Sequence, residues 1–217
     1  MSVINYQIAK GESRDLVIIN QPNAAYHIIQ EAESTLRVHL IYVSKEETEA
    51  QWEAAITVEQ NGENCRTELY GMGLLHGKQQ TNLLTNIVHN VGNGYSSQMI
   101  KLVLDDSAKA TFRGELKIMP DAQKVEAYQT NRNILLSKQA EVITEPQLEI
   151  YADDVKASHG ATTGQLDETA LFYMQQRCID RDTAAKLLLY AFFDEVIKTL
   201  AEEAVQEEIA EQINQIL

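Results

Sequence analysis

The sequence predicts a mainly β fold followed by a small α-helical subdomain. Up to residue 122 the chain consists of short apolar or alternating runs separated by turn signals such as Asn61-Gly62, with no helical segment between them. A further alternating run follows at residues 146–151. Residues 165–217 contain neither glycine nor proline, so their helix content should be high. We therefore expect two domains, at residues 1–164 and 165–217.

The expected strands include residues 16–19, 36–43, 55–58, 67–70, 83–88, 99–104 and 111–118. In the second of these runs, Leu36, Val38, Leu40 and Tyr42 lie on one face. Regular short strands are typical of a sandwich, a barrel or a solenoid, and periodicity alone does not choose between them. The runs also share no repeat of fixed length.

The expected helices begin at plausible N-caps. Asp167 can cap a short helix, and Asp180 can cap a second helix that begins at residue 181. Within this second helix, residues 187–193 form an unbroken apolar run, so the helix must be covered on more than one side. Either the helix at the end of the chain or a partner protein could provide that cover.

Composition restricts the class of protein. The chain has 217 residues, with 18 basic and 32 acidic side chains and a net charge of −14. Such a surface repels phosphate backbones, so a nucleic-acid partner is not expected. No secretory signal or membrane-spanning run is present, and Cys65 and Cys178 are too far apart for a zinc motif. A reducing, cytoplasmic setting fits these features.

One polar turn could carry chemistry on residue types alone. Asp153, Asp154 and His159 place two carboxylates and an imidazole within seven residues, which could bind a divalent metal or exchange protons. The alternative is structural, because aspartates at strand ends also form turns and cap backbone donors. The chain has no phosphate-binding G-x-x-x-x-G-K-[ST] loop, so it is not itself an ATPase, and we find no nucleophile–base pair.

Several motifs resemble one known family from about Leu69 to Leu200. They are Phe112-Arg-Gly-Glu115, Ala127-Tyr-Gln-Thr-Asn-Arg-Asn133, Glu149-Ile-Tyr-Ala-Asp-Asp-Val-Lys156, Ser158-His-Gly-Ala161, Gly164-Gln-Leu-Asp167 and Leu171-Phe-Tyr173. Together they resemble the SufB/SufD core of the Suf iron–sulfur cluster assembly system, and SufD in particular. The resemblance implies a right-handed parallel β-helix, a solenoid wound from one chain, in which Val, Ile and Leu point in and Thr, Asn and Gln can sit at the corners.

The resemblance also implies a role for His159. In SufD proteins a histidine in this setting is associated with cluster assembly at the SufB–SufD interface. Many SufD sequences have cysteine two residues earlier, where this chain has Ala157, and SufB-type sequences often have glutamate where this chain has Gly160. Relatives usually have glycine in place of Cys178, and both cysteines are expected to be inert. We expect no cluster on the protein alone, and a transient iron–sulfur cluster only in a complex.

The implied partners are a SufC-type ATPase and a second SufB- or SufD-type core. The C-terminal helices would dock the ATPase through Leu187, Leu188, Phe192 and Phe193, so the chain would be a scaffold and not an enzyme. Full SufD chains carry a further N-terminal helical region, so this chain is a short paralogue or a fragment. The alternatives are a homodimeric paralogue with an altered or lost assembly role, a polysaccharide-acting β-helix enzyme, and a metal-dependent enzyme using Asp153, Asp154 and His159.

Overall fold

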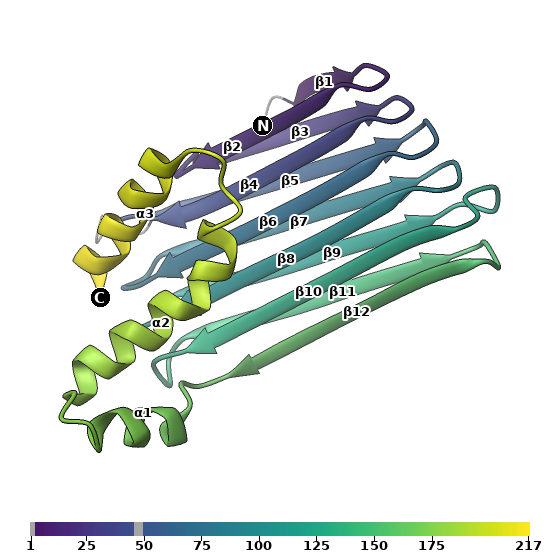
Figure 1. Ribbon diagram of the computed structural model, residues 1–217. Coiled ribbons are helices and arrows are strands. Elements are labelled where there is room, and N and C mark those ends of the chain that lie inside the picture. Colours follow the sequence, from purple (N-terminus) through teal and green to yellow (C-terminus); the bar gives the residue numbers. More distant parts are fainter. Residues whose placement is uncertain (1–2, 46–49) are drawn as a thin grey trace.

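The fold is a parallel β-solenoid with three C-terminal helices, as the family resemblance implies (Figure 1). The computed structural model describes residues 3–45 and 50–217. The strands are β1 (Ile4–Ile8), β2 (Ser13–Ile19), β3 (Asn23–Gln30), β4 (Thr35–Val43), β5 (Gln51–Gln60), β6 (Arg66–Leu75), β7 (Gln80–His89), β8 (Tyr95–Leu104), β9 (Lys109–Ile118), β10 (Val125–Leu135), β11 (Glu141–Ile150) and β12 (Val155–Gly164). The odd-numbered strands form one parallel sheet and the even-numbered strands form another.

The repeat length varies from coil to coil. It is 22 residues between β1 and β3, 30 between β3 and β5, 29 for the next two steps, and 32 between β9 and β11. Turns of different lengths absorb these differences, while the strands stay in register. This variation explains why the sequence reveals no fixed-length motif.

The hydrophobic core lies between the two sheets. Ile28, Val58, Ile87 and Leu116 are Cα partners across four neighbouring strands, and each is at most 1% exposed. On the facing sheet, Leu36, Val38, Leu40 and Tyr42 are all buried, as their alternation predicts. Each such side chain contributes roughly 1.5–3 kcal/mol through burial, so stacking the coils is the main source of stability.

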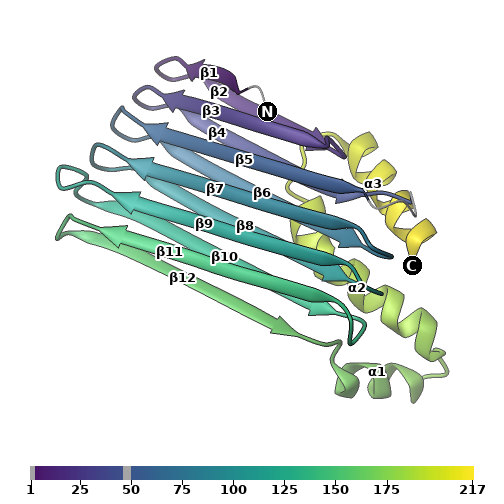
Figure 2. The same cartoon turned by 180° about the vertical axis from the view of Figure 1, so that it is seen from behind.

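The helices are α1 (Glu168–Gln175), α2 (Arg181–Ile197) and α3 (Glu203–Ile216). Asp167 accepts hydrogen bonds from two backbone N–H groups of α1, and Asp180 accepts one from Thr183 of α2, which confirms both predicted caps. Helices α2 and α3 share a hydrophobic cluster with the outer face of the even-numbered sheet. Figure 2 shows no helix over the outer face of the odd-numbered sheet.

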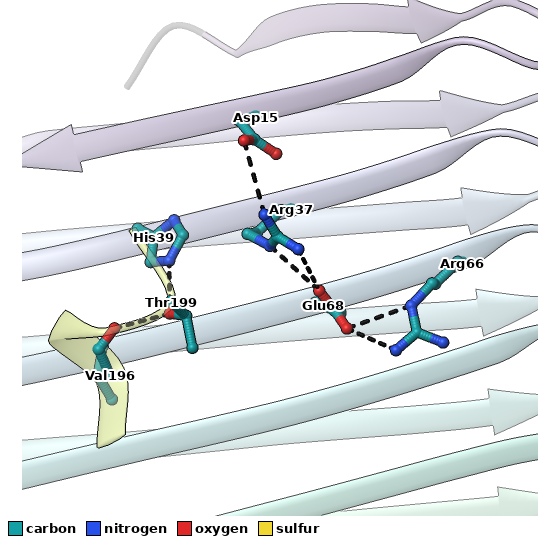
Figure 3. A network of polar contacts seen from close by, with 7 residues as sticks. All are labelled: Asp15, Arg37, His39, Arg66, Glu68, Val196 and Thr199. Carbon is teal, nitrogen blue, oxygen red and sulfur yellow. Dashed lines mark hydrogen bonds and ion pairs between the residues drawn. The ribbon is translucent and has the colours of Figure 1, made fainter. Parts of the chain in front are cut away.

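A polar network fixes the turn between α2 and α3 to the sheet (Figure 3). The Thr199 hydroxyl donates to the Val196 carbonyl at 2.7 Å, so its oxygen accepts from His39 Nε2 at 2.8 Å. Burial, followed by the nearby Arg37 charge, lowers the pKa of His39 to about 4. His39 is therefore neutral at physiological pH and acts as a fixed contact.

Candidate functional site at one end of the solenoid

The solenoid is uncovered at the coil formed by β11 and β12. These two strands end their sheets, and each pairs with a neighbour on one side only. We call their inward-facing side chains the open end: Val142, Thr144, Pro146, Leu148, Ile150, Val155, Ala157, His159, Ala161 and Thr163. All are exposed or half-buried, whereas their register partners on β9 and β10 are buried. Backbone groups on the free side of both strands lack sheet partners, which is typical of a pairing surface.

His159 belongs to this open end. It lies on β12, its Cα partner on β10 is Gln129, and its side chain is exposed. Ala157 lies two residues earlier on the same face and is half-buried beside Ala127. A cysteine at position 157 would therefore stand beside the imidazole, but this chain has only a methyl group there. Gly160 points to the other face of the strand.

Asp153 and Asp154 do not join His159. Both aspartates lie in the turn between β11 and β12, and His159 is four residues beyond the start of β12. An extended strand spans roughly 3.3 Å per residue, so about 13 Å separates Val155 from His159. Within residues 3–45 and 50–217, no group of three or more His, Cys, Asp or Glu residues could hold a metal ion. The geometry therefore does not support the three-residue metal site.

Buried amide side chains lie directly beneath the open end. We call Gln98, Gln129, Asn131 and Asn133 the amide lane; all four face inward from β8 and β10 and are at most 3% exposed. Asn133 Nδ2 donates to Asn131 Oδ1 at 2.7 Å and to Thr163 Oγ1 of the open end at 3.2 Å. These four residues lie within strands and not at the corners of the coils, and they bond to one another.

Gly114 makes room for this lane. A Cβ atom at this position would lie 2.0 Å from Gln129 Nε2 and 2.5 Å from a ring carbon of Phe112. Only glycine therefore lets the Gln129 side chain lie flat between the sheets. The motifs at residues 112–115 and 127–133 are far apart in sequence, and they meet here because each coil stacks on the one before it.

Sequence reasoning missed the lane although a signal was present. Gln129, Asn131 and Asn133 alternate with Tyr128, Thr130 and Arg132, so both faces of this strand are polar. A strand in the middle of a solenoid has one face in the core, so such a pattern requires buried polar groups that bond one another.

The predicted partner-interface residues of α2 differ in exposure. Leu187 is 49% exposed, Leu188 and Phe192 are partly buried, and Phe193 is fully buried against the sheet. Phe193 therefore belongs to the protein's own core. On α1, Phe172 and Tyr173 are 62% and 58% exposed. We call Phe172, Tyr173 and Leu187 the helix patch.

The two cysteines have separate structural settings. Cys65 is buried, and its thiol donates to the Glu31 carbonyl at 3.0 Å. Cys178 is exposed and follows α1 with φ of +63°, a left-handed conformation that favours glycine. This conformation explains why glycine suits position 178.

Among the described residues, no helix is both long and apolar enough to cross a membrane.

Comparison with known proteins agrees with the motifs identified in the sequence. Residues 5–192 match the family model described as SUF system FeS cluster assembly, SufBD core domain. The iron-sulfur cluster assembly protein SufD of Escherichia coli K12 is 37% identical over 157 residues, covering 72% of this chain and 37% of that protein. Protein ABCI7, chloroplastic, of Arabidopsis thaliana is 31% identical and covers 93% of this chain and 46% of that protein. This chain thus spans less than half the length of these two relatives.

Proposed function

Because the chain belongs to the SufBD core family of the SUF iron–sulfur cluster assembly system, we propose that it is a SufD-like scaffold component of that machinery. In this role it pairs with a second SufB- or SufD-type core through the open end and docks a SufC-type ATPase through its helices. The observation that carries the proposal is the uncovered last coil, which presents His159 above a buried polar interior.

Pairing at the open end has a physical basis. Half-buried Val142, Leu148 and Val155 would gain burial against another core, and the free backbone groups of β11 and β12 would gain hydrogen-bond partners. A partner seated there would bring its own ligands next to His159. This matters because one imidazole cannot hold a cluster, whose usual ligands are cysteine thiolates. The cluster is thus cargo that forms between two chains.

ATPase docking is supported by the helix patch. Exposed aromatic and aliphatic side chains on neighbouring helices suit a partner with an apolar groove. The rest of α2 is held against the even-numbered sheet, so force applied at the patch would act on the whole solenoid. Movement of the docked ATPase could in this way shift one scaffold against the other.

Light scattering on a sizing column tests the two contacts separately. The chain is mixed first with a SufB-type core and then with a SufC-type ATPase, both from the same genome. Ala161→Arg, which places a charge on the open end, should abolish the first complex, and Leu187→Asp should weaken the second. Leu84→Asp is the matched control, because Leu84 is 47% exposed on the helix-free sheet. A homodimer that binds neither partner would favour a paralogue with a lost or altered role.

Reconstitution with iron and sulfide tests the role of His159. The isolated chain should give no iron–sulfur absorption band, whereas its complex with a second core should give one that His159→Ala removes. A band of equal intensity in the His159→Ala complex would exclude His159 as a ligand while leaving the scaffold role intact.

A further inference from the structure

The amide lane continues across the strands as a ladder that ends at His159. Gln98 on β8, Gln129 on β10 and His159 on β12 are successive Cα partners on the inner face. Neighbouring strands lie about 4.8 Å apart, so each side chain in this row stacks on the next. The row therefore leads from the buried interior to the open end.

The hydrogen bonds of this ladder have one direction. Gln129 Nε2 donates to Gln98 Oε1 at 3.4 Å, and the Thr85 hydroxyl donates to the same oxygen at 2.7 Å. The donor of Gln129 thus points inward, toward β8. In a ladder of stacked amides, the oxygen of each amide accepts from the strand on the opposite side. For Gln129, that strand is β12.

Gln129 Oε1 is buried and receives no hydrogen bond from the described residues. Leaving such a buried acceptor without a donor is unfavourable, because it has given up its hydrogen bonds to water. On the inner face of β12, Ala157 and Ala161 flank position 159 and carry no side-chain donor, while Thr163 is bonded to Asn133. Across the interior, Thr144 of β11 also has a buried hydroxyl without a partner among the described residues. On β12, the imidazole of His159 is the side chain whose register position suits it to supply the missing N–H.

We propose that Gln129 is a positioning residue for His159. Its amide oxygen accepts a hydrogen bond from one imidazole nitrogen, which selects one tautomer and turns the other nitrogen, with its free lone pair, outward from the open end. Such second-layer hydrogen bonds orient metal-binding histidines generally. The inference deepens the proposed function and rests on it for its biological meaning. Gly114 and Gln98 hold the amide in place, since Gln129 packs against the first and donates to the second.

NMR of the isolated chain with ¹⁵N-labelled histidine tests the proposal without any cluster. Spectra are recorded in mildly alkaline buffer, at about pH 8.5. His159 signals are identified by their loss in His159→Gln. Wild-type protein should show one dominant His159 tautomer. Gln129→Leu should convert it to the mixture found for a free imidazole, and Gln129→Glu, which keeps an acceptor, should restore the single tautomer.

Asn131→Leu is the matched control, since it removes a buried amide from the same strand face at a position paired with Ala161. It should leave the His159 tautomer unchanged. If Gln129→Leu does not fold, Gln129→Met offers a second acceptor-free side chain of similar length. A tautomer mixture in wild-type protein, or an unchanged tautomer in the folded acceptor-free variant, would overturn the proposal.

A second readout separates this inference from the proposed function. In a complex with a second core, Gln129→Leu should lower the iron affinity of the shared site by about 10- to 100-fold, as expected when a histidine loses its orienting partner. If the tautomer responds but His159→Ala leaves the cluster unchanged, the positioning role stands and the cluster role fails. If His159→Ala removes the cluster but Gln129→Leu leaves the tautomer unchanged, the cluster role stands and the positioning role fails.

Discussion

An ion pair between Lys101 and Glu195 joins the solenoid to α2, and we expect the protein to respond unequally to loss of its two partners. Lys101 on β8 lies beneath α2, and its side chain is only 2% exposed. Its ammonium donates to the Phe192 carbonyl at 2.6 Å and forms an ion pair with Glu195, whose side chain is 51% exposed. Hence the cation is buried, whereas its carboxylate partner remains half in water.

Removing the carboxylate should cost more than removing the cation. Glu195→Gln leaves the buried ammonium without its ion-pair partner, and we expect a loss of about 2–3 kcal/mol in the free energy of unfolding, less than for a fully buried pair because Glu195 is half-exposed. Lys101→Met also breaks two hydrogen bonds, but it removes the desolvated charge and keeps the apolar stem, so the loss should be about 1 kcal/mol or less.

Urea denaturation followed by circular dichroism measures both free energies of unfolding. The ion pair also predicts a pH dependence. Hydrogen bonding from Lys101 lowers the pKa of Glu195, while burial lowers the pKa of Lys101. The stability due to Glu195 is therefore present above the ordinary glutamate pKa and is lost as the pH falls through the lowered value. In Glu195→Gln the free energy of unfolding should therefore fall less steeply at acid pH. An equal or larger loss for Lys101→Met would refute the reasoning.

Three further predictions concern other parts of the fold. Cys178→Gly should raise the free energy of unfolding by about 0.5–1 kcal/mol, because glycine adopts the left-handed backbone conformation of this position without steric strain. Cys178→Ala is the control and should show no gain in urea denaturation. Burial lowers the pKa of both His39 and His89 to about 4. Through each of these histidines, the free energy of unfolding should therefore fall by up to about 3 kcal/mol as the pH falls from 6.5 to 4. Glutamine at either position should make the free energy of unfolding less dependent on pH, as measured by denaturation at several pH values. An unchanged pH dependence would contradict this. Gly114→Ala should lower the free energy of unfolding by about 1–3 kcal/mol, because the added methyl group would clash with the Gln129 amide. An unchanged thermal unfolding temperature would show that the Gln129 side chain can adopt another position.

The chain's local chemistry determined a large part of the fold. Alternating side chains in the run that contains Leu36 and Tyr42 identified a strand and its buried face, because successive side chains of a strand point to opposite sides. Asp167 and Asp180 identified two helix starts, because a carboxylate satisfies backbone N–H groups that no turn of the helix can reach. These signals need only neighbouring residues, so they can be read from the sequence.

The site depends on contacts that alternation alone does not reveal. Gly114, Gln129 and His159 come together because coils of 29 to 32 residues stack in register, and the varying repeat length hides that register from the sequence. For the same reason Phe193 could not be separated from Leu187 within one apolar run: packing of α2 on the sheet buries the first and leaves the second exposed. Sequence thus identified several strands, the helical segment and two caps, but it took Asp153, Asp154 and His159 for one polar turn, whereas His159 lies on β12. The tertiary structure decided which polar groups face the core and which apolar groups face water, because burial is a property of the whole packed solenoid.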